Sequence, residues 1–447
     1  MKKQQLNNPY LLFLPFLLVY IGYVLIVQKS VLWGDEIRHY DEAMRFASGH
    51  FIKPGGPVEI RNGPGYPLFI TLFLWLHIPL LLLKLLNAVV TYLSIVLLFK
   101  SMRYYVSYRL ALLVCVFWGC YFHNLDFMPY LYSENVAVFL SVFLLFLSIK
   151  AIHNQNVLKN KYVYLAGLVF AYLALTKVIF GYVIICMLGI NVLLLFFMPK
   201  AGSIKKTALI NLVALLAVVP YLSLTYSLTG KVFYWASSGG NNLYWMSSYY
   251  PGEYGSWFSA TMLEMDSISH KPGDSKRKVD IIDKGAAYIP GTIDSIQKHH
   301  EAAYKDIYRF DGVQRDEAFK KHFFENVKAH PKKYLINCFS NIGRMLFNFP
   351  YSYSTQKPGT LLRIPLNGIV VLFTLLCMLP TILNWRKLPY LSRYFLFFSA
   401  VYFGGSILGS AELRMFSIIA PLLLFWIAVI LEQFVRIRLK SDQPFNL

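Results

Sequence analysis

Long apolar stretches alternate with short polar segments along most of the chain. A helix that crosses a membrane needs about 20 mostly apolar residues, and ten stretches come near that length. The expected spans are residues 9–28, 80–99, 109–124, 134–150, 161–177, 178–199, 207–228, 361–383, 393–410 and 416–434. The pattern predicts an all-α polytopic membrane protein with about ten transmembrane helices.

A further apolar stretch, residues 65–78, has only 14 residues between two prolines, so charge must decide whether it crosses. If it does not cross, the six short segments on the N-terminal side hold 17 Lys and Arg and one acidic residue. If 65–78 crossed the membrane, fifteen of those 17 basic residues would lie on the extracytoplasmic side. Lys and Arg are instead concentrated in cytoplasmic loops. We therefore expect 65–78 to lie along the interface or to re-enter, with both termini cytoplasmic.

This topology divides the chain into three parts. Residues 1–228 form a membrane core, whose first extracytoplasmic loop (29–79) contains short juxtamembrane helices. Residues 229–360 form an extracytoplasmic lobe that is mainly helical, because apolar residues recur there at helical spacing, as in 316–324. Residues 361–447 supply the last membrane helices and a short cytoplasmic tail.

The composition agrees with a membrane protein. Only 15% of the residues are charged and 56% are apolar, whereas soluble domains have about 25% charged residues. The net charge of +20 would favour nucleic acid as a partner of a soluble protein. Here most of the excess lies in the cytoplasmic segments, so the expected partner is the lipid bilayer and not nucleic acid. Five cysteines have no metal-ligand spacing, and neither a P-loop nor an HExxH motif is present.

The first extracytoplasmic loop is rich in candidate catalytic residues. Asp35 and Glu36 follow the first span by about eight residues, and Arg38 and Glu42 come next on an expected short helix. Helical spacing places Asp35, Arg38 and Glu42 on one face. Paired carboxylates at a membrane surface can act as a general base or hold a cation against a phosphate. They can equally cap the helix N-terminus, and the sequence leaves both interpretations open.

Isolated charges near other helix ends converge on the same membrane face. They are Asp126, Glu134, Lys177, Glu412 and Arg414. Each alone could be a snorkelling side chain or a helix cap. Together they place acids beside cations that suit an anionic phosphate.

Six short motifs, taken in order, resemble those of GT-C membrane glycosyltransferases, in particular the branch of the protein O-mannosyltransferases and the aminoarabinose transferases of lipid A. The motifs are Asp35-Glu36, the stretch 62–68, Ser133-Glu134, Leu175-Thr176-Lys177, the stretch 239–244 and the stretch 414–421. Three departures stand out. Val178 replaces a frequent Pro, Glu134 replaces a frequent Asp, so that Asp126 competes for its role, and the large C-terminal soluble domain of the aminoarabinose branch is missing.

The resemblance implies transfer of a sugar from a polyprenyl-phosphate donor to a glycan, lipid or protein acceptor on the extracytoplasmic face, by an inverting displacement. In this interpretation Asp35 is the general base, Glu36 and Glu134 assist it, and Lys177 and Arg414 bind the donor phosphate. The proposed reaction does not require a divalent metal, and whether the protein uses one stays an open question. Further candidate residues are Arg38, Glu42, Arg61, Asp126, Glu412, Asn241 and Tyr244.

Two other functions also act on lipid-linked glycans. A transporter or flippase of lipid-linked glycans should show paired internal halves and charges at mid-span, and the charges here cluster at one face instead. A polymerase or ligase of surface polysaccharide remains an alternative, although the position of Asp35-Glu36 directly after the first span favours the transferase. A bacterial inner membrane is the expected location.

Overall fold

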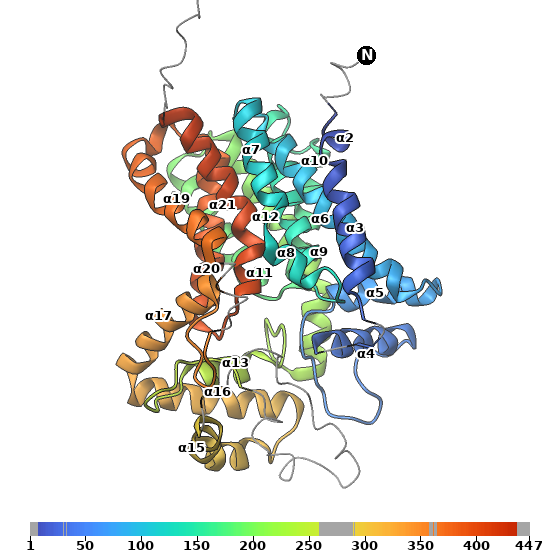
Figure 1. Cartoon of the computed structure of the whole chain (residues 1–447), viewed down its shortest axis with the longest axis vertical. Coiled ribbons are helices and arrows are strands. Elements are labelled where there is room, and N and C mark those ends of the chain that lie inside the picture. Colours follow the sequence, from blue (N-terminus) through green and yellow to red (C-terminus); the bar gives the residue numbers. More distant parts are fainter. Residues whose placement is uncertain are drawn as a thin grey trace, which may run out of the picture.

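The computed structural model describes residues 8–29, 31–32, 34–258, 289, 291–356, 361 and 364–435. In this part of the chain the regular structure is helical, which confirms the expected fold class. The helices form a membrane bundle, and a smaller helical lobe lies beyond one end of it (Figure 1).

Seven of the described helices are long and apolar enough to cross a membrane. They are α6 (Leu80–Met102), α9 (Glu134–His153), α11 (Ile179–Phe197), α12 (Gly202–Thr229), α19 (Ile364–Leu383), α20 (Tyr390–Leu408) and α21 (Leu413–Phe434). The other three expected spans are shorter apolar helices. They are α2 (Pro9–Leu12) with α3 (Leu14–Val27), α7 (Tyr108–Gly119) and α10 (Lys161–Thr176). The chain is therefore a multi-pass membrane protein, and the count of ten spans stays a prediction.

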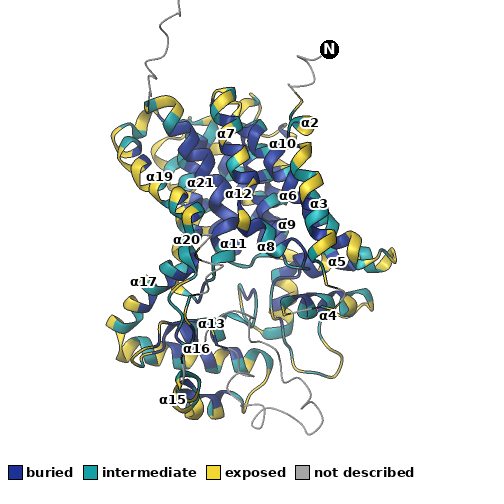
Figure 2. Cartoon of the chain, in the orientation of Figure 1, coloured by how far each residue is buried: buried dark blue, intermediate teal, exposed yellow. Residues whose placement is uncertain are grey.

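Helix α21 lies at the centre of the bundle. Its residues 416–430 form an unbroken buried run, because α9, α19 and α20 pack around it. By contrast, α19 turns much of its surface outwards (Figure 2). A short 3-10 turn, η2 (Trp385–Lys387), connects α19 to α20. A central α21 gives the residues at its N-terminal end a fixed position relative to the rest of the bundle.

One expected span differs in detail, and the short stretch 65–78 is a helix too short to cross, as expected. The expected span 109–124 is broken, since α7 ends at Gly119 and α8 (Phe122–Phe127) follows. The carbonyl of Gly119 accepts a hydrogen bond from the Tyr20 hydroxyl instead of continuing the helix ladder. The stretch 65–78 forms α5 (Gly65–Trp75), which at 1.5 Å per residue covers about 16 Å, short of a hydrocarbon layer of about 30 Å.

The lobe contains α13 (Gly239–Met246), α15 (Thr292–Ile307), α16 (Gly312–Ala329) and α17 (Pro331–Phe347). Its small core is aromatic, with Tyr244, Trp245, Tyr304 and Phe319 among its buried members. Helix α17 ties the lobe to the bundle. Its Asn341 side chain donates to main-chain carbonyls at the end of α20 and accepts from the N–H of Ala411 at 2.9 Å. This anchor fixes the chain just before α21 begins.

Candidate functional site

Helix α4 (Asp35–Ala47) places the first candidate acid at the end of the bundle that faces the lobe. The preceding Gly34 has φ +57° and ψ −123°, a conformation that favours glycine, and a Cβ there would lie 2.9 Å from the Tyr132 hydroxyl. This tight turn directs the chain from the first membrane helix into α4. Asp35 is consequently the first residue of the helix.

Four predicted site residues from distant parts of the sequence meet in one ion-pair cluster. The Arg414 guanidinium contacts the Asp35 carboxylate at 2.7 Å and the Glu134 carboxylate at 3.6 Å. The Lys177 ammonium contacts Glu134 at 2.7 Å. The four side chains come from α4, the start of α9, the end of α10 and the start of α21. We call Asp35, Glu134, Lys177 and Arg414 the central cluster.

Two further predicted residues border the central cluster. Glu412 contacts the Arg414 Nε atom at 2.9 Å, and Arg38 contacts Asp35 at 3.2 Å, one helical turn along α4. Three carboxylates thus face three cations, so the set is close to neutral. The Asp35, Lys177 and Arg414 side chains retain 22–27% exposure, which leaves them reachable from the junction between bundle and lobe.

Electrostatics keep Asp35 ionised. Burial acts to raise the pKa of its carboxyl, but Arg414 and Arg38 outweigh burial and hold that pKa well below its usual range. Burial also lowers the pKa of the neighbouring His39 to about 3, so that imidazole is neutral at physiological pH. The central cluster therefore contains an ionised acid, and a neutral histidine lies beside it.

Two of the sequence motifs are in direct backbone contact. A Cβ on Gly63 would overlap the carbonyl oxygen of Leu175, and a Cβ on Gly65 would lie 2.7 Å from the backbone nitrogen of Thr176. The Tyr172 hydroxyl also donates to the carbonyl of Gly65 at 2.9 Å. The glycines of the loop therefore let it pack against the end of α10, where Lys177 begins the next turn.

Glu36 is placed differently from its neighbour Asp35. Its carboxylate is fully buried, accepts from the N–H of Leu131 at 2.8 Å and lies 3.4 Å from the Lys84 ammonium. Successive helical residues point about 100° apart, so one acid faces the central cluster and the other faces α6. Glu36 fastens α4 to α6 and to the segment before α9.

Three other predicted candidates lie apart from the central cluster. Asp126 lies 3.8 Å from His123, whereas Glu134 is the acid that contacts both Lys177 and Arg414. Arg61 pairs with Glu59 at 2.9 Å on an exposed part of the loop. Glu42 is buried on α4, and burial raises its pKa to about 7 against the opposing effect of nearby arginines.

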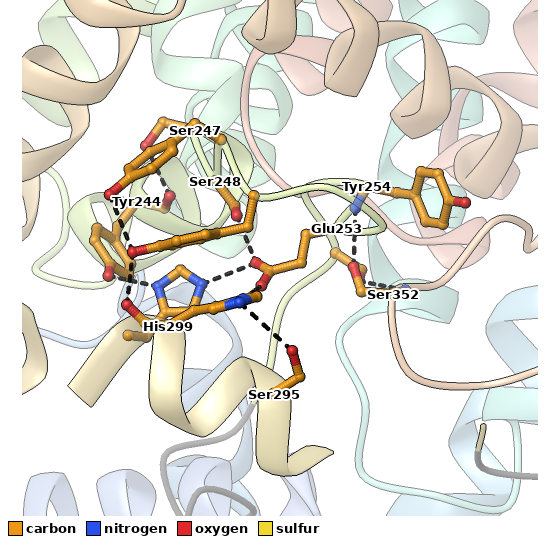
Figure 3. A network of polar contacts seen from close by, with 12 residues as sticks. Tyr244, Ser247, Ser248, Glu253, Tyr254, Ser295, His299 and Ser352 are labelled. Carbon is orange, nitrogen blue, oxygen red and sulfur yellow. Dashed lines mark hydrogen bonds and ion pairs between the residues drawn. The ribbon is translucent and has the colours of Figure 1, made fainter. Parts of the chain in front are cut away.

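Tyr244, a candidate residue in the lobe, belongs to a separate polar network. The Tyr244 hydroxyl contacts His300 Nδ1 at 2.6 Å, and His300 Nε2 contacts the Glu253 carboxylate at 2.8 Å. His299 contacts the other Glu253 oxygen at 2.8 Å, and the Ser248 hydroxyl donates to Glu253 (Figure 3). Asn241 lies on the same short helix as Tyr244, and its side-chain oxygen is buried. We call Tyr244, Ser248, Glu253, His299 and His300 the lobe network.

Sequence reasoning missed three residues beside the central cluster. His39 is buried edge-on to Tyr66, with ring centroids 5.0 Å apart, and neither His39 Nδ1 nor the Tyr66 hydroxyl has a hydrogen-bond partner among the described residues. The Arg414 guanidinium lies 5.8 Å from the ring of Tyr132. The spacing of His39, four residues after Asp35 on one helix face, was the signal that could have identified it.

Within the described ranges, no group of three or more His, Cys, Asp or Glu side chains is arranged to hold a metal ion.

Comparison with solved structures gives a relative of this fold. No protein-family model matches the chain, and no curated protein matches its sequence. The fold is similar to the crystal structure of ArnT from Cupriavidus metallidurans bound to undecaprenyl phosphate, with a TM-score of 0.38 and 12% identity, covering 94% of this chain and 77% of that one. A match at this level of similarity assigns no role to any residue of this chain.

Proposed function

We propose that the protein is an integral-membrane glycosyltransferase, which transfers a sugar from a polyprenyl-phosphate donor to a hydroxyl group of a glycan, lipid or protein. The central cluster is the observation that carries this proposal. It joins Glu134, Lys177 and Arg414, at the ends of apolar helices, to the Asp35 carboxylate at the start of α4. Ionisable groups at such a position are costly and favour a functional role.

Lys177 and Arg414 are the proposed ligands of the donor phosphate. A polyprenyl chain partitions into the bilayer, so its phosphate must be bound near a membrane surface. An arginine fork suits phosphate oxygens, and a lysine adds a point charge. Because carboxylates hold Arg414 in the structure, an arriving phosphate would replace one of them. Exchange of one anion for another leaves the guanidinium neutralised throughout.

The reaction is a single displacement. The acceptor oxygen forms a bond to the anomeric carbon while the bond from that carbon to the phosphate oxygen breaks, and its electron pair leaves with the phosphate. The proton of the acceptor hydroxyl passes to the Asp35 carboxylate, since a hydroxyl with a pKa far above 7 needs a base. Lys177 and Arg414 neutralise the departing phosphate. Attack opposite the phosphate inverts the anomeric configuration.

Donor binding would also make Asp35 a better base. Arg414 lowers the pKa of the Asp35 carboxyl through a contact at 2.7 Å. When a phosphate draws the guanidinium away, that pKa rises towards its ordinary value and the carboxylate holds a proton more strongly. Glu134, held by Lys177, would orient the acceptor. Glu36 would assist indirectly, because its buried contacts fix α4.

Turnover of the donor tests this proposal. The measurement is release of polyprenyl phosphate from a panel of polyprenyl-phosphate sugars by the purified full-length protein. Asp35→Asn should lower the rate about 100- to 10,000-fold, because it removes the proton acceptor. Arg414→Gln and Lys177→Gln should each lower it about 10- to 100-fold through lost phosphate contacts.

Two variants serve as matched controls. Asp126→Asn removes an acid that lies against His123, and Arg61→Gln removes a cation from an exposed pair. Both should release polyprenyl phosphate within about threefold of the unaltered protein, since neither touches the central cluster. Undiminished turnover by Asp35→Asn would refute its role as the base. If no such donor is consumed while a lipid-linked glycan changes leaflet, the protein is a transporter instead.

A further inference from the structure

A basic cavity lies at the end of the bundle opposite the central cluster. Its volume is about 550 Å³, within the range of about 300–1,000 Å³ that is usual for ligand pockets. Its lining includes the cations Lys100, Arg103 and Lys150 and the rings of Phe99, Tyr108 and Phe146. They come from the end of α6, the start of α7 and the end of α9.

The lengths of two helices place this cavity far from the proposed transferase site. Along α6, Lys84 lies beside Glu36, and Lys100 follows about 24 Å further on at 1.5 Å per residue. Along α9, Glu134 belongs to the central cluster, and Lys150 lies about 24 Å away by the same measure. Helix α2, whose Pro9 also lines the cavity, lies at the end of the bundle away from the lobe in Figure 1.

The three cations rest against rings and neutral oxygens. Lys150 lies 5.4 Å from the Tyr104 ring and 5.7 Å from the Phe146 ring. Lys100 lies 4.0 Å from the Tyr10 ring and donates to its hydroxyl at 2.8 Å. Arg103 donates to the carbonyl of Val106 at 2.8 Å. Such cation–π contacts stabilise a positive charge without neutralising it.

Carboxylates near the cavity do not neutralise these charges. Across the residues for which the structure gives positions, Lys100, Arg103 and Lys150 form no ion pair within 4.0 Å. Glu432, the acidic residue of α21, lies at this end and accepts from the N–H and the hydroxyl of Ser107. Three positive charges therefore share one cavity, and an anion entering it would meet no opposing carboxylate.

We infer that this cavity binds the phosphate-bearing headgroup of an anionic membrane lipid. The cations provide contacts for the phosphate, and the aromatic walls suit the apolar part of a lipid next to it. Basic pockets between membrane helices bind headgroups of this kind. A lipid bound there would connect α2, α6, α7 and α9 at their shared end. This inference does not depend on the transferase activity.

Lipid binding to the purified full-length protein provides the test, with phosphatidylglycerol as the anionic probe and phosphatidylcholine as the neutral one. Native mass spectrometry of detergent-solubilised protein gives the affinities. Lys100→Gln combined with Lys150→Gln should weaken phosphatidylglycerol binding about 30-fold, because each surface lysine contributes about fivefold. Lys150→Arg should keep the affinity within about threefold. That variant retains the charge and shows that the position itself tolerates change.

The matched control removes two lysines at the same end of the bundle but outside the cavity. Lys159→Gln combined with Lys161→Gln should change phosphatidylglycerol affinity by less than about twofold. If this control weakened phosphatidylglycerol binding equally, the lipid would respond to the total positive charge at this end of the bundle and not to the cavity. The inference would then be wrong. Equal affinity for phosphatidylcholine would also overturn it. Displacement of phosphatidylglycerol by equimolar inorganic phosphate would identify a site for a soluble anion instead of a lipid.

Discussion

Two networks around acidic residues lie on the same side of the bundle, and their carboxylates contact different partners. In the central cluster, Asp35 and Glu134 contact a guanidinium and an ammonium. In the lobe network, Glu253 contacts two imidazoles and a serine hydroxyl. The first network joins four elements that are distant in sequence, whereas the second lies within the lobe.

This difference means that the charged groups of the central cluster can exchange one ionic partner for another. In the lobe network, neighbouring residues of the lobe already supply the hydrogen bonds of Glu253. The cations of the central cluster can release a carboxylate and bind a phosphate, since both anions fit a guanidinium fork. Glu253 has its oxygens occupied by three short-range donors, and its side chain is 6% exposed. We therefore expect the central cluster to govern catalysis and the lobe network to govern stability.

Replacement of Glu253 should give the largest change in stability. Glu253→Gln should lower the free energy of unfolding of the lobe by about 2–4 kcal/mol at pH 7, because buried donors lose their charged acceptor. Burial acts to raise the pKa of Glu253, but hydrogen bonds from His300, Ser248 and His299 hold it below the usual 4.5. The stabilisation is therefore complete above about pH 4.5. It is lost as the pH falls through the lower pKa that Glu253 has in the folded state.

Thermal unfolding at several pH values measures this effect. The difference between the unaltered protein and Glu253→Gln should shrink as the pH falls below 4.5. Glu301→Gln, on the exposed face of α15, is the matched control and should melt like the unaltered protein. Loss of donor turnover by Glu253→Gln without any loss of stability would break the distinction between the two networks.

Replacement of Glu42 should change the free energy of unfolding by a smaller amount and in the opposite direction. It shares α4 with Asp35, yet it forms no ion pair within 4.0 Å in the described part of the chain. Its folded pKa of about 7 lies above the usual 4.5, so stability falls as the pH rises from about 4.5 to 7 and the deficit persists at higher pH. Glu42→Gln should therefore stabilise the protein by about 1–3 kcal/mol at pH 8.

The control for Glu42 is Glu59→Gln, an exposed acid of the same loop that pairs with Arg61. Melting curves at pH 8 and pH 4 should show a gain for Glu42→Gln only at the higher pH. A loss of stability at pH 8 would mean that nearby arginines hold the Glu42 carboxylate ionised, as they do for Asp35.

Hydropathy was sufficient to predict most of the bundle, because apolar length alone selects membrane helices. The short stretch 65–78 was expected not to cross, and the 11-residue helix α5 is too short to do so by itself. The break after Gly119, where the carbonyl accepts from the Tyr20 hydroxyl nearly one hundred residues earlier in the chain, could not be predicted from local hydropathy.

The site was predicted less completely. Span direction brought Glu134, Lys177 and Arg414 to one end of the bundle, and the structure places them in contact. The sequence placed Glu36 beside Asp35 as an assisting acid, and it could not show that tertiary contacts to Lys84 and Leu131 bury Glu36 away from the central cluster. Nor could it show that Tyr244 lies in the lobe core, since aromatic residues serve equally as ligand platforms and as packing.

Binding of polyprenyl phosphate to three purified proteins tests the central claim most directly. If Arg414 exchanges a carboxylate for the donor phosphate, Arg414→Gln should bind about 10- to 100-fold more weakly than the unaltered protein. Asp35→Asn should bind at least as tightly as the unaltered protein, because the competing carboxylate is gone while the cation remains. Equal weakening in both variants would contradict the account, since it would show that the central cluster is a structural clamp and not a phosphate site.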